Sequence, residues 1–326
     1  MIYPIETADL TRMRGQLLFD GADCARKLSR FWALLTLAAV IASAGIVADS
    51  TATVIGAMIV APLMTPIMAS ALAIVSADAR HLWRSLLIVL AGVATAVGRS
   101  YLLGVLSPGG VDAATNGQVS GRVNPSLIDL IVALASGAAG AFALSRRNVS
   151  DALPGVAIAI SLVPPLCVVG IMLANHDPSA AAGASLLFVT NFLAILIAGG
   201  GMLAIMGYGR VAFAAHSRSR RRAAIVIAVV TVLVCVPLAV TGAQVARDSR
   251  LEFQIQSKAE AALGSGAVQL ASVHANGDRV EVTLEGPPTV AARAAREVAD
   301  RIHAAHPELD VRVFLLRSEY VEVRPG

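Results

Sequence analysis

At residues 54–74 the chain runs VIGAMIVAPLMTPIMASALAI, an apolar stretch with Pro62 and Pro66 near its centre. The stretch is long enough to cross a bilayer as a helix, which takes about 20 residues. A central proline has no backbone N–H and clashes with the preceding turn, so the sequence predicts a kink or break here. The backbone carbonyls of Met58 and Pro62 would then lack their usual partners and need protein, water or a bound ion instead. The alternative is a packing kink that neighbouring helices stabilise.

A second apolar stretch of the same kind, LPGVAIAISLVPPLCVVGI, occupies residues 153–171. Gly56 precedes Pro66 by 10 positions and Gly155 precedes Pro165 by 10, so the two stretches align at an offset of 99. The same offset also aligns the apolar segments that flank them. The pattern predicts an internal duplication. The alternative is coincidence between two segments drawn from a small set of apolar residues.

The composition is that of an integral membrane protein. Hydrophobic residues make up 56% of the chain, charged residues only 15%, and the mean hydropathy is +0.71. Such values are far from those of soluble domains. The predicted spans are 31–48, 51–75, 82–106, 126–144, 152–174, 182–206 and 223–243. We therefore predict an all-α polytopic membrane fold, with three-helix repeats at 31–106 and 126–206 and a seventh transmembrane helix at 223–243.

Arginine and lysine gather in every second loop. The rich segments are residues 1–30, 80–84, 146–147 and 210–222, and the poor ones are 49–51, 107–124 and 175–181. Basic residues favour the cytoplasmic side, which predicts a cytoplasmic N-terminus in a multi-pass protein of the inner cell membrane. Seven spans then place the tail outside. Because each repeat holds three spans, the second copy crosses in the opposite sense, which predicts inverted repeats with proline-broken helices.

The segment 1–30 is predicted to lie on the cytoplasmic side, before the first span. Leu10, Met13, Leu17 and Leu18 fall on one face of a helix. Such a face suits a helix that lies in the membrane interface. A segment packed on the protein, or a disordered one, is an equal alternative.

Two broken helices at matching places in inverted repeats point to a transporter site near the bilayer midplane. The prolines of the breaks are Pro62, Pro66, Pro164 and Pro165. The candidate oxygen ligands at that depth are the carbonyls of Met58, Pro62, Ile160 and Ser161 and the side chains of Thr65, Ser161, Thr190 and Asn191. Serine and threonine hydroxyls also bond to their own helix, whereas an amide in the membrane needs a partner. Free carbonyls favour cations and half-helix N-termini favour anions, so both solute classes stay open.

Two charged residues, Arg99 and Asp129, lie within predicted spans and toward the same side of the membrane. Their opposite signs predict a structural ion pair that joins the two repeats. A gating role and simple snorkelling to the interface are the alternatives. Small residues at 136–140 and 199–201 predict close helix packing, either within one chain or between copies in a homo-oligomer.

The tail at 246–326 is predicted to form a small extracytoplasmic α+β domain. Val280, Val282 and Leu284 alternate with polar residues, as in a half-buried strand. A helix with one apolar face and a further strand at 309–315 follow. The three cysteines are dispersed along the chain and the histidines show no ligand spacing, so we predict no metal site, no disulfide framework and no cofactor.

Three segments carry a resemblance to a known family. They are STATVIGAMIVAPLMTPI at 50–67, NPSLID at 124–129 and ALPGVAIAISLVPPL at 152–166. The chain resembles, over about residues 15–206, a prokaryotic family of uncharacterised hydrophobic-domain membrane proteins, which is catalogued as a domain of unknown function. The resemblance implies a bacterial or archaeal membrane location. It implies no substrate and no catalytic residue.

Three functional hypotheses follow. The first is a transporter or channel for a small solute or ion, and the second is a membrane-anchored sensor or scaffold whose C-terminal domain binds a partner. Seven spans with duplicated breaks exceed what an anchor needs, which favours the first. The third is an intramembrane enzyme, which we do not expect because no carboxylate pair, metal-ligating set or nucleophile–base spacing lies in the spans. We expect the lipid bilayer as a partner and no nucleic acid.

Overall fold

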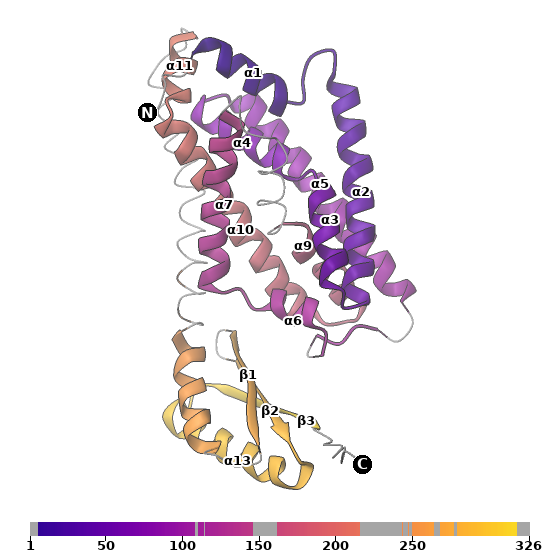
Figure 1. The fold of residues 1–326 in the computed structure, drawn as a ribbon, viewed down its shortest axis with the longest axis vertical. Helices are drawn as coiled ribbons and strands as arrows, with labels where there is room; N and C mark the ends of the chain where they lie inside the picture. The colour runs from indigo at the N-terminus through magenta and orange to yellow at the C-terminus, as the bar shows by residue number, and fades with distance from the viewer. Residues whose placement is uncertain are drawn as a thin grey trace, which may run out of the picture. The chain divides into compact units, whose positions relative to one another are not determined.

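The computed structural model describes residues 6–107, 110–113, 115–145, 162–215, 250–263, 268–276 and 279–317, together with 243 and 247. The predicted span at 223–243 and the residues Ile160 and Ser161 therefore lie outside the described part, except for residue 243. The chain divides into two compact units, Met1–Gly242 and Ala243–Gly326 (Figure 1). Each unit is described by itself below.

The first unit is helical throughout its described part. Its helices are α1 Thr7–Leu17, α2 Cys24–Val47, α3 Thr51–Val60, α4 Met64–Val75, α5 Ala79–Leu106, α6 Gly117–Val123, α7 Leu127–Ser145, α9 Val163–Ala174, α10 Pro178–Ile205 and α11 Tyr208–Ala215. By length and composition α2, α5, α7 and α10 can each cross a membrane, and α3 with α4 passes the same test as a bent pair. Helix α9 is a shorter apolar helix. The prediction of several apolar helices long enough to cross a membrane is confirmed for the described residues, which contain four such helices, or five spans with the bent pair.

Three helix junctions share one design, a left-handed residue followed at once by a capping residue. The left-handed residues are Asp49, Ala77 and His176, with φ of 48°, 51° and 59°, and the capping residues are Ser50, Asp78 and Asp177. The N–H of each capping residue donates to a carbonyl five positions back, at 2.8, 2.8 and 2.9 Å. Its side chain then accepts from the first turn of the next helix. One helix thus ends in a Schellman-type motif and the next begins without an intervening loop.

Helix α1 packs on the bundle. Leu10, Met13, Leu17 and Leu18 are all buried in the main apolar cluster of the unit. Helix α1 contacts α4, α7 and α11. Of the two interpretations that the sequence allows for this face, packing on the protein is the one that the structure shows.

The second unit is a small α+β domain with a core of its own. Residues 250–263 are helical, and β1 Gln269–Asn276, β2 Arg279–Gly286, α13 Pro288–Ala305 and β3 Asp310–Arg317 follow. Strand β1 pairs antiparallel with β2, and β2 pairs parallel with β3 after the α13 crossover. Val280, Val282 and Leu284 are fully buried, as their alternation predicts. The sheet packs against Ile255 and Val298 of the two helices.

Candidate functional site

The helical span of residues 51–75 is interrupted between α3 and α4, and the axes of these two helices differ in direction by 49°. The last regular bond of α3 runs from the Ala61 N–H to the Ala57 carbonyl, at 3.1 Å. The next donor would be residue 62, and proline has none. No hydrogen bond reaches the carbonyl oxygens of Met58, Ile59 and Val60 from any residue that the structure describes. Within the described part of the chain, these three acceptors at the break therefore have no donor.

One predicted acceptor is not free. The Pro62 carbonyl lacks its usual partner, since Pro66 has no N–H, but it accepts the Thr65 N–H at 3.2 Å instead. Helix α4 begins at Met64, which puts Pro66 in the first turn, where the missing N–H has no intrahelical partner to lose. The Pro66 carbonyl also accepts the Ser70 hydroxyl at 2.9 Å. Pro62 alone interrupts the helix, and Pro66 helps to restart it.

Pro164 and Pro165 have the same role in the second half. Helix α9 begins at Val163, and both prolines lie in its first turn and are buried. Each helix begins directly after a buried leucine, α4 after Leu63 and α9 after Leu162. The carbonyls of Ile160 and Ser161, which the sequence places at this break, lie outside the described residues.

Two pairs of helices repeat at the predicted offset. Helices α4 and α9 have 12 residues each, and their first residues are 99 positions apart (163 − 64). Helices α5 and α10 have 28 residues each, and Ala79 and Pro178 are again 99 positions apart. The predicted offset therefore holds for element bounds as well as for residues.

Equivalent helices also exchange partners. Helix α4 packs on α5 and α10, and α9 packs on α10 and α5. A Cβ built on Gly170 of α9 would lie 2.6 Å from the Tyr101 backbone nitrogen of α5. The residues equivalent to these two, Ala71 and Gly200, are also neighbours, since a Cβ on Gly200 would lie 4.0 Å from the Ala71 Cβ. Such reciprocal contacts are the pattern that a local two-fold axis produces.

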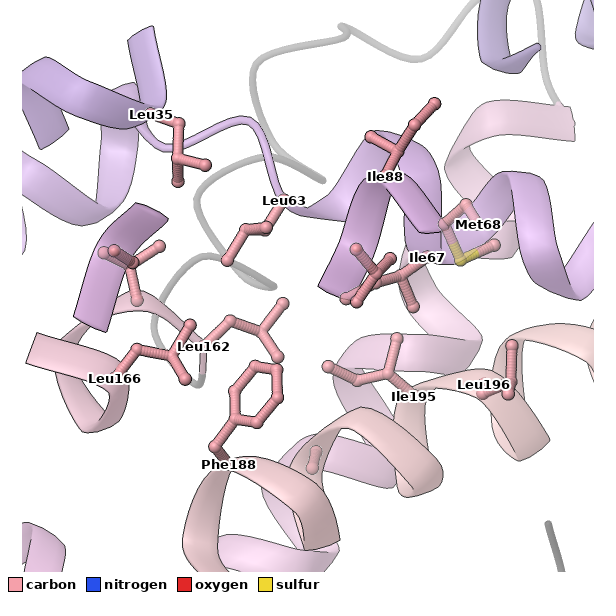
Figure 2. Packing of buried hydrophobic residues seen from close by; sticks show 14 of the residues in the cluster. Leu35, Leu63, Ile67, Met68, Ile88, Leu162, Leu166, Phe188, Ile195 and Leu196 are labelled. Atoms are coloured by element: carbon pink, nitrogen blue, oxygen red, sulfur yellow. The ribbon is translucent and has the colours of Figure 1, made fainter. Parts of the chain in front are cut away.

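The residues that directly precede α4 and α9 lie in one apolar cluster. Leu63 and Leu162 are equivalent residues and are each only 1% exposed. Figure 2 shows their side chains extending into the same part of the cluster, with Phe188 and Ile195 of α10 and Ile67 of α4 around them. Leucines, and not polar groups, therefore fill the space between the starts of α4 and α9, while the rest of the second predicted break lies outside the described residues.

Asn191 lies on the face of α10 that looks toward this cluster. It stands between Phe188 and Ile195, about one helical turn from each, and is 3% exposed. Its equivalent in the first half is Gly92, where an added Cβ would lie 3.1 Å from the Leu63 side chain. The second half therefore carries an amide where the first half has no side chain.

The two threonines of the predicted site differ in burial. Thr190 is 2% exposed, and its hydroxyl has no hydrogen-bond partner among the described residues. A buried polar group without a partner costs on the order of 1–3 kcal/mol, so such a group marks a candidate site. Thr65 is half-buried. Within the break, its backbone N–H donates to the Pro62 carbonyl.

The predicted ion pair between Arg99 and Asp129 is not formed in the described structure. The Asp129 carboxylate accepts from the Ser126 backbone N–H at 2.9 Å and from its hydroxyl at 2.6 Å, while Arg99 is exposed. The Asp129 carboxylate interacts electrostatically with the Arg122 guanidinium of α6. Burial lowers the pKa of the Arg122 guanidinium, and the Asp129 carboxylate offsets part of that change. Asp129 thus stabilises the first turn of α7 instead of joining α7 to α5.

Helix α6, which carries Arg122, is not evident from the sequence. Its N-cap is Asn116, whose side chain accepts from the N–H groups of Gln118 and Val119 at 3.0 Å each. The Asn116 amide also donates to the Ile46 carbonyl at 2.8 Å, and the Gln118 amide donates to the Thr51 hydroxyl at 2.8 Å. The asparagine cap was the one local signal for this seven-residue helix.

Residues 58–197 match the model of the family described as "Domain of unknown function (DUF389)". An uncharacterized protein of Methanocaldococcus jannaschii is 32% identical over 183 residues, which cover 56% of this chain and 56% of that protein. The chain thus spans about half the length of the curated relative that it matches. The resemblance to an uncharacterised membrane family is confirmed, and the matched region contains the break at Pro62 and all of the described candidate site.

Proposed function

We propose that this protein is a transporter or channel that moves a small solute or ion through a site between the two breaks. The carbonyls of Met58, Ile59 and Val60, to which no described residue donates, are the observation that carries the proposal, because such acceptors within a membrane need a partner from the protein, from water or from a ligand. The reciprocal contacts of the two halves support it. In known transporter folds, discontinuous helices of two repeats line a midplane site in this way.

The site favours a cation or a solute that donates hydrogen bonds. The break offers carbonyl oxygens, and Thr190 adds a buried hydroxyl. An anion would bind to the free N–H groups at the start of a half-helix. Pro66, Pro164 and Pro165 remove such N–H groups from the first turns of α4 and α9. We therefore propose that the solute is a cation or a molecule that donates hydrogen bonds.

The described arrangement corresponds to a closed site. Leu63 and Leu162 fill the contact between the breaks. Passage of a solute requires these two leucines to separate. We place this event near the bilayer midplane, between inverted three-helix repeats.

Flux into proteoliposomes tests the proposal. The purified full-length chain is reconstituted and tested with K⁺, Na⁺, ammonium, choline, chloride and phosphate. We expect uptake of at least one cation and loss of that uptake in Pro62→Ala, which restores a donor to the Met58 carbonyl. Pro178→Ala, at the first position of α10, is the matched control and should retain uptake. Uptake of anions alone would reject the solute class, and no uptake of any solute would reject the function.

The proposal includes an orientation, with the N-terminus in the cytoplasm and the second unit outside the inner membrane. The alternating arginine clusters support it. A cysteine introduced as Ser272→Cys, in a chain whose native cysteines are replaced by serine, should react with a membrane-impermeant thiol reagent in intact cells. Labelling only after lysis would reverse the orientation of this unit.

A sensor or scaffold is the second candidate function. The separate core of the C-terminal unit, with Val282 and Ile302 at 0% exposure, favours it. In that case the spans would only anchor the unit. The same flux assay separates the two functions, since an anchor would move no solute.

A further inference from the structure

Helix α1 joins the two halves of the membrane unit at one end. The Arg12 guanidinium donates to the Leu144 and Ser145 carbonyls at 3.4 and 3.2 Å, which are the last two of α7. Arginine is well placed there, since carbonyls at a helix end are open and carry partial negative charge. Arg14, half a turn further along α1, lies 3.8 Å from the Asp78 carboxylate at the start of α5. One short helix therefore holds α7 of the second half and α5 of the first.

A histidine strengthens the contact with the first half. The His81 Nδ1 lies 2.7 Å from an Asp78 oxygen, and its Nε2 lies 3.1 Å from an oxygen of Asp20, in the link between α1 and α2. A carboxylate only accepts, so both ring nitrogens must donate to make both bonds. Only the protonated ring can do so. The neutral ring keeps one bond and loses the other.

The tight turn at Ala77 and Asp78, before α5, forms a corner, and the second half contains the same corner before α10, at His176 and Asp177, without this network. Asp177 caps α10 as Asp78 caps α5, accepting the Ala180 N–H at 3.0 Å as Asp78 accepts the His81 N–H at 3.3 Å. Ala180 stands where His81 stands in the first half. The corner therefore folds without a histidine, and His81 serves something other than capping.

The remaining charges around His81 have other roles or lie in solvent. The Lys27 ammonium donates to the Gly15 and Leu18 carbonyls at the end of α1. Arg84 donates to the Cys24 sulfur at 3.1 Å. Arg80, beside His81, is exposed, and so is Arg26 of α2, which pairs with Asp23 at 2.8 Å. The groups of α1 and of its link to α2 that meet His81 and its cap are thus Asp20 directly and Arg14 through Asp78.

We propose that α1 is a proton-sensitive clamp, which fastens the two halves while both ring nitrogens of His81 carry a proton and loosens when the ring loses one of them. Histidine is the side chain whose charge most readily changes near neutral pH. The Arg12 guanidinium stays charged, so its bonds to α7 are kept. Only the contact of α1 with the first half is weakened. This inference does not depend on which solute the protein moves, or on whether it moves one.

Hydrogen exchange of residues 7–18 tests the clamp. Protection factors, corrected for the pH dependence of chemical exchange, are measured on the full chain at pH 6 and pH 8. In the unmodified chain we expect protection to fall about tenfold at pH 8, as the loss of one charge-assisted bond implies. In His81→Gln it should be low and equal at both values. Ala180→Gln, at the equivalent position of the second half, should behave as the unmodified chain does.

A second variant guards against a general effect of losing His81. Asp20→Asn leaves the Asp78 cap intact and removes only the acceptor for Nε2. It should also abolish most of the pH response of residues 7–18. A tenfold fall that persists in both variants would overturn the proposal, and so would equal protection at the two pH values in the unmodified chain.

Discussion

The corner that precedes α5 and the corner that precedes α10 have the same backbone and different side chains. Ala77 and His176 take the same left-handed conformation, and Asp78 and Asp177 cap the next helix in the same way. Around Asp78 there are also His81, Asp20 and Arg14, whereas among the described residues the Asp177 side chain bonds only to the Ala180 N–H that it caps. The fold thus needs only the cap and the left-handed residue. The extra charged residues of the first corner are therefore not needed for the turn or the cap.

The largest expected effect is at the leucines where the breaks meet. Leu63→Ala and Leu162→Ala should each lower the free energy of unfolding by about 3 kcal/mol, because each leaves a cavity in a packed cluster. If the two halves are equivalent here, the two losses should agree within about 1 kcal/mol, which is the scatter expected from context. Thermal unfolding in detergent measures both. A large loss for one leucine and none for the other would break the equivalence.

The glycines of the reciprocal contacts should respond unequally. Gly170→Ala should cost about 2 kcal/mol or more, since its Cβ would lie 2.4 Å from the Val97 carbonyl oxygen. Gly200→Ala should cost less than about 0.5 kcal/mol, because its nearest neighbour, the Val75 side chain, would lie 3.9 Å away. The same unfolding assay applies. Equal costs would show that α9 does not approach α5 as closely as described.

The two capping aspartates sharpen the comparison of corners. Asp177→Ala should cost about 1 kcal/mol, as loss of an N-cap does. Asp78→Ala should cost about 2 kcal/mol, since the His81 and Arg14 contacts are lost as well. Equal losses in thermal unfolding at pH 6 would mean that the network around Asp78 contributes no stability.

The excess loss at Asp78 should depend on pH. Burial raises the pKa of Asp78, but the hydrogen bonds from His81 and the charges of His81 and Arg14 outweigh this and hold that pKa below its usual value. A depressed pKa stabilises the fold above the unfolded-state pKa of aspartate, about 3.9, and the contribution is lost as the pH falls through the lower folded-state value. On the acid side of pH 6, the gap in the free energy of unfolding between Asp78→Ala and the unmodified chain should therefore narrow only below about pH 4. A gap that narrows between pH 6 and 5 would contradict this.

The smallest effect separates the two prolines of the first break. Pro62→Ala supplies an N–H for the Met58 carbonyl and should raise the free energy of unfolding by about 1 kcal/mol. Pro66→Ala should change it by less than about 0.5 kcal/mol, since an N–H at that position of the first turn gains no bond within α4. A matching gain for both would show that Pro66 also interrupts the helix.

Long apolar runs located the spans well. The predicted spans at 82–106 and 182–206 correspond to α5 and α10, with starts early by three and four residues in the structure because Asp78 and Asp177 cap the helices. The 99-residue offset was also visible in the sequence, since prolines and glycines mark it. Both features depend on residues close together in the sequence, so they can be predicted without knowledge of the tertiary packing.

The errors concern how helices face one another. Arg99 and Asp129 have opposite charge and similar depth, but depth does not fix the rotation of a helix, and α7 packs chiefly on α10. The bond from the Thr65 N–H to the Pro62 carbonyl was not expected, because the start of α4 cannot be located from an unbroken apolar run. The apolar contact between Leu63 and Leu162 depends on tertiary packing that no local pattern encodes.

The difference between Gly92 and Asn191 has a consequence for how such a chain evolves. Two similar halves with reciprocal contacts are what gene duplication and fusion produce from a homodimer. In a homodimer every residue near the axis occurs twice, so an amide beside the leucine contact would need two partners. A fused chain can change one copy alone. Leu63 and Leu162 are the same residue type at equivalent positions, whereas Gly92 and Asn191 differ, so the leucine contact has an amide on one side where the other side has no side chain.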